Sequence, residues 1–152
     1  MDPQDAIEKA RNNEDVKRLT DYFMCSCFAC IKDIKDEINE WTLFFYNEKK
    51  KLVIDCFVND KFVTLGEETP PLSTVEKPDF SERQVTIKEA LEIVGKKFTQ
   101  KTINVLITLH QKGTLVWTIN MITPGMMAVT FDIDAKTGKI IKEEETSLIR
   151  RL

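Results

Sequence analysis

The chain has 152 residues, of which 42% are hydrophobic, enough for one medium domain or two small ones that fold without a cofactor. Its 22 Lys and Arg residues against 25 Asp and Glu residues give a net charge of -3, which offers no electrostatic footprint for nucleic acid. No apolar run approaches the roughly 18 residues of a membrane span, and the acidic start differs from a secretion signal, so we predict a cytoplasmic protein without nucleic acid or membrane partners.

The first predicted element is a helix at the N-terminus. Asp2 is a suitable N-cap and Pro3 a suitable first helical residue, because proline lacks only an N–H group that the first turn leaves free anyway. The pair Asn12-Asn13 interrupts the helical pattern, which then continues at three apolar positions: Val16, Leu19 and Phe23. The first helix is therefore predicted to be bent or doubled.

Strand-like segments follow in the first half of the chain. Residues 24–31 are apolar enough to lie in a core, and large apolar residues recur in two later segments, residues 41–43 and 52–57. Residues 66–80 carry three of the five prolines and almost no hydrophobic periodicity. That segment is predicted to be a linker.

A second helix is predicted at the start of the second half. Residues 86–89, Thr-Ile-Lys-Glu, form a capping box, in which the Thr86 hydroxyl can accept from the Glu89 N–H and the Glu89 carboxylate can reach back. Apolar residues recur after the cap at helical spacing: Ile87, Ala90, Leu91, Val94 and Phe98. The helix is predicted to run to about Phe98.

Beyond this helix the hydrophobic period changes to two residues, which is typical of half-buried strands. The pairs Lys112-Gly113 and Pro124-Gly125 separate three alternating segments, and residues 134–138 supply a turn before a short returning strand at Ile140. One face of this antiparallel sheet is predicted to pack under the helix, and it comprises Val105, Ile107, Leu109, Leu115, Trp117, Ile119, Val129, Phe131 and Ile133.

The two halves of the chain follow the same plan. Residues 6–8, Ala-Ile-Glu, match residues 90–92, Ala-Leu-Glu, and Trp41-Thr42-Leu43 matches Trp117-Thr118-Ile119. We therefore predict an α+β fold of two units in tandem, each a helix followed by an antiparallel meander. The chain is divided into a first unit, a Pro-rich linker and a second unit: residues 1–66, 67–80 and 81–152.

The second unit resembles the PepSY domain, a cystatin-like fold. The resemblance rests on IKEALEIV in the helix, LVWTINM in a middle strand and VTFDIDAKTGKII at the end, where Asp134 and the Thr137-Gly138 turn close the late strand. The first unit matches only at its helix start and its Trp-Thr-Leu strand, and residues 58–62 stand where the Thr-Gly turn would be. PepSY domains occur in propeptides of thermolysin-like proteases and in bacterial envelope proteins, where they bind or inhibit protein partners. The resemblance therefore implies a binding or regulatory role and carries no catalytic residue over.

The cysteines are the best candidates for a metal site. Cys25, Cys27 and Cys30 form a C-x-C-x-x-C cluster, and Cys56 lies on a later strand. On a continuous strand Cys25 and Cys27 would point to one face and Cys30 to the other, so a shared metal would need a bend or a bulge. The apolar surroundings favour small buried side chains over a disulfide or a metal site.

No assembly of a nucleophile, a base and an oxyanion donor can be recognised in the sequence, so no catalytic residue is predicted. His110 is the only histidine, and its place at a strand end predicts an exposed loop residue. Asp132-x-Asp134 followed by Gly138 fits a turn between strands better than a calcium loop, because Lys136 and Thr137 occupy positions that such a loop requires for a ligand and a glycine. Asp132 is then predicted to be a solvated strand residue.

The other face of the second sheet is semi-polar, with Thr108, Thr118 and Thr130 interspersed with aliphatic residues. Such a face either packs against the first unit or accepts another chain, and the open edge strands offer a route to a homodimer. We therefore predict a non-catalytic module that binds a protein or peptide through these threonines, with neither cofactor nor metal. The alternative is a metal-binding or redox thiol protein that uses the cysteine cluster.

Overall fold

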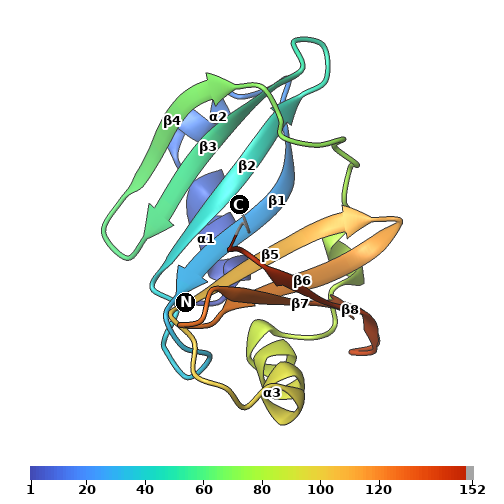
Figure 1. The fold of residues 1–152 in the computed structure, drawn as a ribbon. Helices are drawn as coiled ribbons and strands as arrows, with labels where there is room; N and C mark the ends of the chain where they lie inside the picture. Colours follow the sequence, from blue (N-terminus) through green and yellow to red (C-terminus); the bar gives the residue numbers. More distant parts are fainter. Residues whose placement is uncertain (150–152) are drawn as a thin grey trace.

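The computed structural model describes residues 1–149 as one continuous eight-stranded antiparallel sheet with helices on one side (Figure 1). The elements in chain order are α1 (Pro3–Arg11), α2 (Glu14–Lys17), β1 (Phe23–Ile31), β2 (Glu40–Asn47), β3 (Leu52–Asn59), β4 (Val63–Thr69), the 3-10 helix η1 (Phe80–Glu82), α3 (Ile87–Lys97), β5 (Asn104–Lys112), β6 (Thr114–Ile122), β7 (Met127–Asp134) and β8 (Ile140–Ser147). The α+β class and the antiparallel strands are as predicted.

Local hydrogen bonds account for where the helices begin. The Asp2 carboxylate accepts from Gln4 N at 2.8 Å, and the Asn13 side chain accepts from two amides of α2. The chain thus starts a second helix where Asn12-Asn13 interrupts the first, as predicted, but α2 ends at Lys17, so the expected helical stripe does not reach Phe23, which begins β1. At α3, Thr86 Oγ1 accepts from Glu89 N at 3.1 Å, the first half of the predicted capping box.

Strands β1 and β5 join the two halves of the sheet. The strand order is β4-β3-β2-β1-β5-β6-β7-β8, so each half contributes four consecutive strands and β4 and β8 are the edges. In the central pair, Ser26 lies opposite His110 and Phe28 opposite Thr108. The halves therefore meet edge to edge, through backbone hydrogen bonds between β1 and β5.

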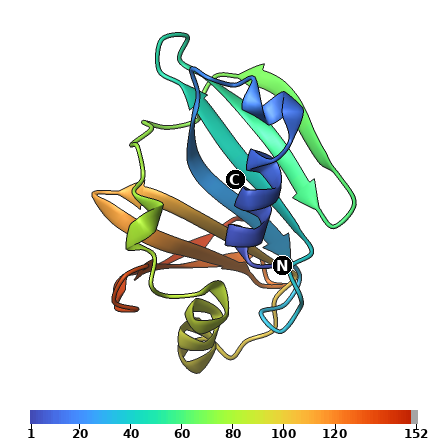
Figure 2. The same cartoon turned by 180° about the vertical axis from the view of Figure 1, so that it is seen from behind.

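Helices α1 and α3 lie on the same face of the sheet. We call this the inner face and the opposite one the outer face. Seen from behind, α1 crosses the strands of the first half, while α3 lies beside those of the second half (Figure 2). Apart from Pro3, the buried residues of α1 and α3 belong to a single core cluster with inward-facing strand residues, and all nine residues predicted to pack under the second helix are in it. At roughly 25 cal/mol per Å² of apolar area, this shared core is the main source of stability.

Two tryptophans occupy the centre of the core. Trp41 and Trp117 are fully buried, and their ring centroids are 6.3 Å apart. The Trp41 indole N–H donates to the Met1 carbonyl at 2.9 Å, and the Trp117 indole N–H donates to the Val85 carbonyl at 2.9 Å. Met1 and Val85 each precede the N-cap of a helix, so each tryptophan fixes the start of one helix against the sheet.

The segment between the halves is shorter than the predicted linker and partly ordered by contacts. Strand β4 runs to Thr69, three residues into residues 67–80, and η1 begins at Phe80. In between, Lys77 lies over the Phe23 ring at 5.6 Å, and Glu76 accepts from Gly113 N at 3.2 Å. These contacts hold the segment, residues 70–79, against the ends of β1 and of the β5–β6 hairpin.

The turn at residues 134–138 forms as predicted. Asp134 Oδ1 accepts from the amides of Lys136 and Thr137 at 2.8 and 3.0 Å, and Gly138 adopts a φ of 80°. A left-handed φ of this kind is easily adopted only by glycine. The residues that suggested a calcium loop therefore make a hairpin turn.

Candidate binding face

The three predicted site residues all lie on the outer face. Thr108 of β5 is directly opposite Thr118 of β6, and Thr130 of β7 is opposite Asn120, the next outward-facing residue of β6. All three threonines are half-buried. The structure therefore brings them onto one surface across three neighbouring strands.

A chain of polar contacts crosses this surface at Thr118. The Thr118 hydroxyl donates to Asp132 Oδ1 at 2.6 Å and lies 2.8 Å from His110 Nε2. Lys112 Nζ donates to Asp132 Oδ2 at 3.1 Å. Three strands thus supply one network, which contains the only histidine of the chain.

The carboxylate at one end of the network fixes the protons along it. The Thr118 hydroxyl has one proton and donates it to Asp132, so its oxygen accepts from His110. His110 therefore carries its proton on Nε2, and Nδ1 presents a lone pair. The network supplies one acceptor nitrogen on the outer face.

Two expectations about this network are wrong. His110 lies within β5 and is half-buried, where the sequence suggested an exposed loop, because β5 extends to Lys112. Asp132 is 6% exposed, where the sequence suggested a solvated residue, because it lies between the Thr118 hydroxyl and the Lys112 ammonium. A buried carboxylate is costly without hydrogen-bond partners of this kind.

We expect the pKa of His110 to lie below 6.5, and the single histidine makes the measurement direct by proton NMR titration of its ring. Burial lowers this pKa and the Lys112 charge lowers it further, while Asp132 and Glu76 oppose the shift. Asp132→Asn should lower it more, and Lys112→Met should raise it. Because the unfolded chain takes up the proton first as the pH falls below 6.5, stability should decrease from there toward the folded-state pKa.

Asp60→Asn is the control for this titration, since Asp60 is exposed in the β3–β4 turn. It should leave the pKa of His110 unchanged. A His110 pKa at or above 6.5 in the unmodified protein, or equal shifts in Asp60→Asn and Asp132→Asn, would contradict the described network.

The cysteines are not assembled into one site. A β-bulge falls between Met24 and Ser26, so Cys25 has no partner on β2 and lies outside the core cluster, whereas Cys27 and Cys56 lie inside it. Cys30 is exposed, and all four thiols are free. Among residues 1–149, no group of three or more His, Cys, Asp and Glu side chains could hold a metal ion. The sequence suggested that a bulge could gather the cysteines around a metal, but this bulge separates Cys25 from Cys27.

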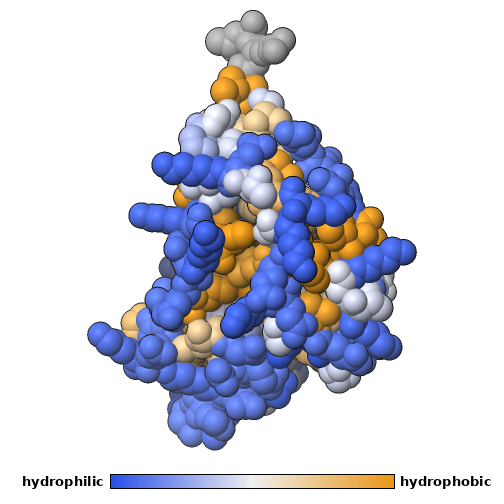
Figure 3. Space-filling view, turned by 90° about the horizontal axis from the view of Figure 1, so that it is seen from below, coloured by the Kyte–Doolittle hydropathy of each residue, from blue (hydrophilic) through white to orange (hydrophobic). Residues whose placement is uncertain are grey.

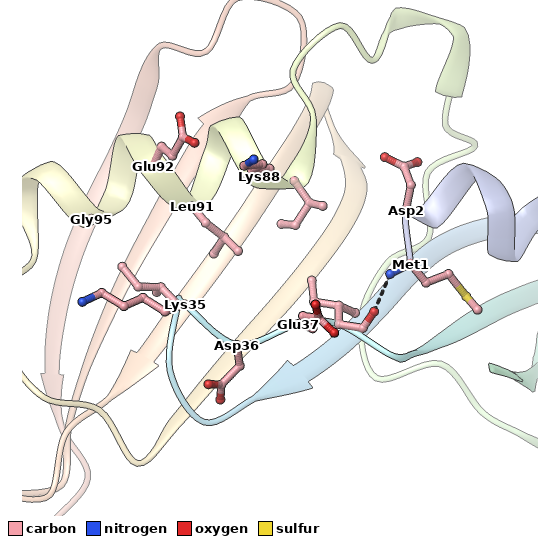
Figure 4. A pocket seen from close by; sticks show the side chains of 12 residues that line it. Met1, Asp2, Lys35, Asp36, Glu37, Lys88, Leu91, Glu92 and Gly95 are labelled. Atoms are coloured by element: carbon pink, nitrogen blue, oxygen red, sulfur yellow. Dashed lines mark hydrogen bonds between the residues drawn. The ribbon is translucent and has the colours of Figure 1, made fainter. Parts of the chain in front are cut away.

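A groove opens on the side of the molecule that carries α3. It encloses about 920 Å³ between α3 and the β1–β2 loop, and its apolar lining includes Ile34, Ile38, Ile87 and Leu91. Figure 4 shows Leu91 pointing from α3 toward the loop, and the Met1 ammonium donating to the Ile38 carbonyl. Seen from below, the molecule shows hydrophobic surface in a hollow bordered by projecting hydrophilic side chains (Figure 3).

A second, smaller pocket lies on the outer face of the first half. It encloses about 670 Å³ between strands β1 to β3 and residues 69–75. Ser26, Phe44 and Asp55 line it, and the neighbouring linker residues include Pro71 and Leu72. The segment between the halves therefore forms one wall of a pocket as well as a connection.

Sequence reasoning missed Asp132, Lys112 and Asp55 as site residues. The signal for Asp132 was present, because a carboxylate at an outward position between two apolar neighbours invites a cross-strand partner. Nothing local placed Asp55 in a pocket, since residues 69–75 reach it only through the tertiary fold.

Comparison with known protein families gives a match in the second half of the chain. Residues 84–144 match the PepSY family, described as "Peptidase propeptide and YPEB domain". No curated protein sequence matches the chain. Among residues 1–149, no helix has the length and apolar character needed to cross a membrane.

A solved structure has the same overall fold. It is the crystal structure of a "putative lipoprotein" from Clostridium difficile 630, with a TM-score of 0.67 and 17% sequence identity. The similarity covers 96% of this chain and 93% of that chain, so it includes both halves of the sheet. Residues 84–144, which hold α3, strands β5 to β7 and the first part of β8, carry a PepSY domain.

Proposed function

We propose that this protein is a non-catalytic regulatory module that binds a protein or peptide on the outer face of its sheet. The observation that carries the proposal is that both helices pack on the inner face, which leaves a semi-apolar face covered by neither. The PepSY domain supports the class of function, because its relatives include propeptides. The binding site is proposed at Thr108, Thr118 and Thr130.

An unsatisfied polar atom in the same surface supports this site. Asn120 Oδ1, beside Thr118 and opposite Thr130, is buried and has no hydrogen-bond partner within residues 1–149. A buried acceptor without a donor costs about 1–3 kcal/mol. A partner chain that brings an N–H group to this surface, with a small side-chain rearrangement, would recover that cost.

The proposal includes a tandem origin for the two halves, with boundaries near residues 1–66 and 81–152. Each half is a helix followed by four antiparallel strands, and the strand order is symmetric about the β1–β5 pair. The matching bonds of Trp41 and Trp117, each to the carbonyl before a helix cap, support it further. The first half would then be a divergent PepSY-like unit.

Two further points belong to the proposal. The edge strands β4 and β8 offer a route to a homodimer, which would use backbone groups and leave the outer face free. The cytoplasmic location expected from the sequence has no support from the comparisons, and the name of the Clostridium difficile neighbour makes a lipid-anchored or extracellular location the competing proposal. Fractionation of the native host followed by immunoblotting distinguishes the two.

A pull-down from the native host tests the binding face. Thr118→Arg places a long charged side chain in the centre of the three threonines, and we expect the captured partner to be lost at least tenfold relative to wild type. Thr20→Arg is the matched control, because Thr20 is exposed and lies outside the sheet. Circular dichroism checks that both variants fold.

Retention of the same partners by a folded Thr118→Arg variant would contradict the proposed face. Thr130→Arg provides a second test that leaves the contact between Thr118 and Asp132 intact. Loss of partners in both face variants but not in Thr20→Arg is the expected pattern.

A further inference from the structure

The floor of the 670 Å³ pocket is one cross-strand row of the sheet. Ser26 of β1 lies opposite Phe44 of β2, and Phe44 lies opposite Asp55 of β3. His110 continues the same row on β5, since it is opposite Ser26. The pocket therefore adjoins the polar network of the proposed binding face, and one extended ligand could reach both.

The linker walls the pocket and leaves apolar surface at its rim. Residues 69–75 line one side, and Val53 on the floor is only 7% exposed as a result. Leu72, by contrast, has its side chain entirely in solvent. An exposed leucine beside a pocket lined by an aromatic ring and two prolines suits a ligand with an apolar stem.

The charged group of the pocket is an unpaired carboxylate. Among residues 1–149, Asp55 has neither an ion-pair partner nor a side-chain hydrogen bond, and burial raises its pKa. It lies opposite a bulge in β4 at Gly66 and Glu67, and a Cβ added at Gly66 would come within 3.4 Å of the Asp55 Cβ and 3.3 Å of the Phe57 ring. The absence of a side chain at Gly66 lets the backbone of β4 pass close to Asp55 without crowding it.

We propose that this pocket binds an arginine side chain of the peptide partner, with the stem on Phe44 and the linker prolines and the guanidinium on Asp55. An unpaired carboxylate favours a cation, and a guanidinium is less strongly hydrated than an ammonium and stacks on aromatic rings. The partner is thus a peptide with an arginine next to the segment that lies over Thr118. This inference rests on the proposed function and adds the chemistry of its specificity.

The test uses acetyl-arginine amide and its neutral analogue acetyl-citrulline amide, titrated into the full chain and followed by amide NMR shifts. We expect shifts at Ser26, Phe44 and Asp55, and binding at least tenfold weaker for the citrulline probe. Asp55→Asn, which keeps the shape of the side chain, should weaken binding of the arginine probe by a similar factor. Asp60→Asn makes the same charge change at an exposed turn and should bind like wild type.

Equal affinity for the two probes would overturn the assignment, as would shifts confined to the groove beside α3. The assignment would also be overturned if Asp60→Asn weakened binding of the arginine probe as much as Asp55→Asn does. The pull-down separates this inference from the proposed function. If the probes fail while Thr118→Arg still releases the partner, the arginine pocket is wrong and the binding face stands.

Discussion

Replacing Trp117 by alanine should lower the free energy of unfolding by about 3–5 kcal/mol, the usual cost of removing a buried tryptophan. The Trp117 side chain is 0% exposed to solvent and packs on the Trp41 ring. Its loss also leaves the Val85 carbonyl without its indole donor at the start of α3. Urea unfolding followed by circular dichroism measures the change.

Two further variants separate packing from the hydrogen bond. Trp117→Phe keeps most of the apolar volume and should cost less than the alanine substitution, while still losing the indole donor. Phe62→Ala removes a large apolar side chain that is 48% exposed, and it should change stability by no more than about 0.5 kcal/mol. A loss in Trp117→Ala as small as that in Phe62→Ala would show that the tryptophan pair does not hold the core together.

The native protein should contain one fast-reacting thiol and three slow ones. Cys30 is exposed, whereas Cys25, Cys27 and Cys56 are buried. Burial raises the pKa of Cys27 to about 12 and that of Cys56 to about 11, and it raises the pKa of Cys25 as well. Because the thiolate is the reactive form, a rise of two pKa units alone slows the reaction about a hundredfold. Titration with a chromogenic disulfide at pH 8 measures the rates.

Cys30→Ser is the control and should remove the fast phase alone, while unfolding in urea should make all remaining thiols react together. This experiment also addresses the thiol or metal alternative. A second fast thiol in the folded protein, or stoichiometric zinc that protects Cys30, would favour that alternative over a binding module.

Local patterns predicted the elements that form through local interactions. The capping residue Thr86 and the apolar stripe after it located α3, and the period of two separated the buried face of β5 to β7 from the threonine face. Residues 134–138 form their predicted turn for the same reason, since Asp134 bonds to amides two and three residues away.

Features that depend on residues far apart in the sequence could not be predicted from local patterns. No periodicity reveals that β1 pairs with β5, so the joining of both halves into one sheet could not be predicted. The bulge that moves Cys25 out of the core has no local signature, and the pocket at Asp55 requires the linker to return to the sheet. The threonine surface could be placed on a face, but its hydrogen-bond network could not.

The pairing of β1 with β5 also determines the order in which the chain can complete its fold during synthesis. The first four strands can form as soon as residue 69 has left the ribosome, yet Ser26 waits for His110, 84 residues later in the chain. Until then, the backbone of the apolar strand β1 is an open edge, which is prone to pair with other chains. Translation speed through the linker and α3 thus sets how long the newly made first half is exposed to aggregation.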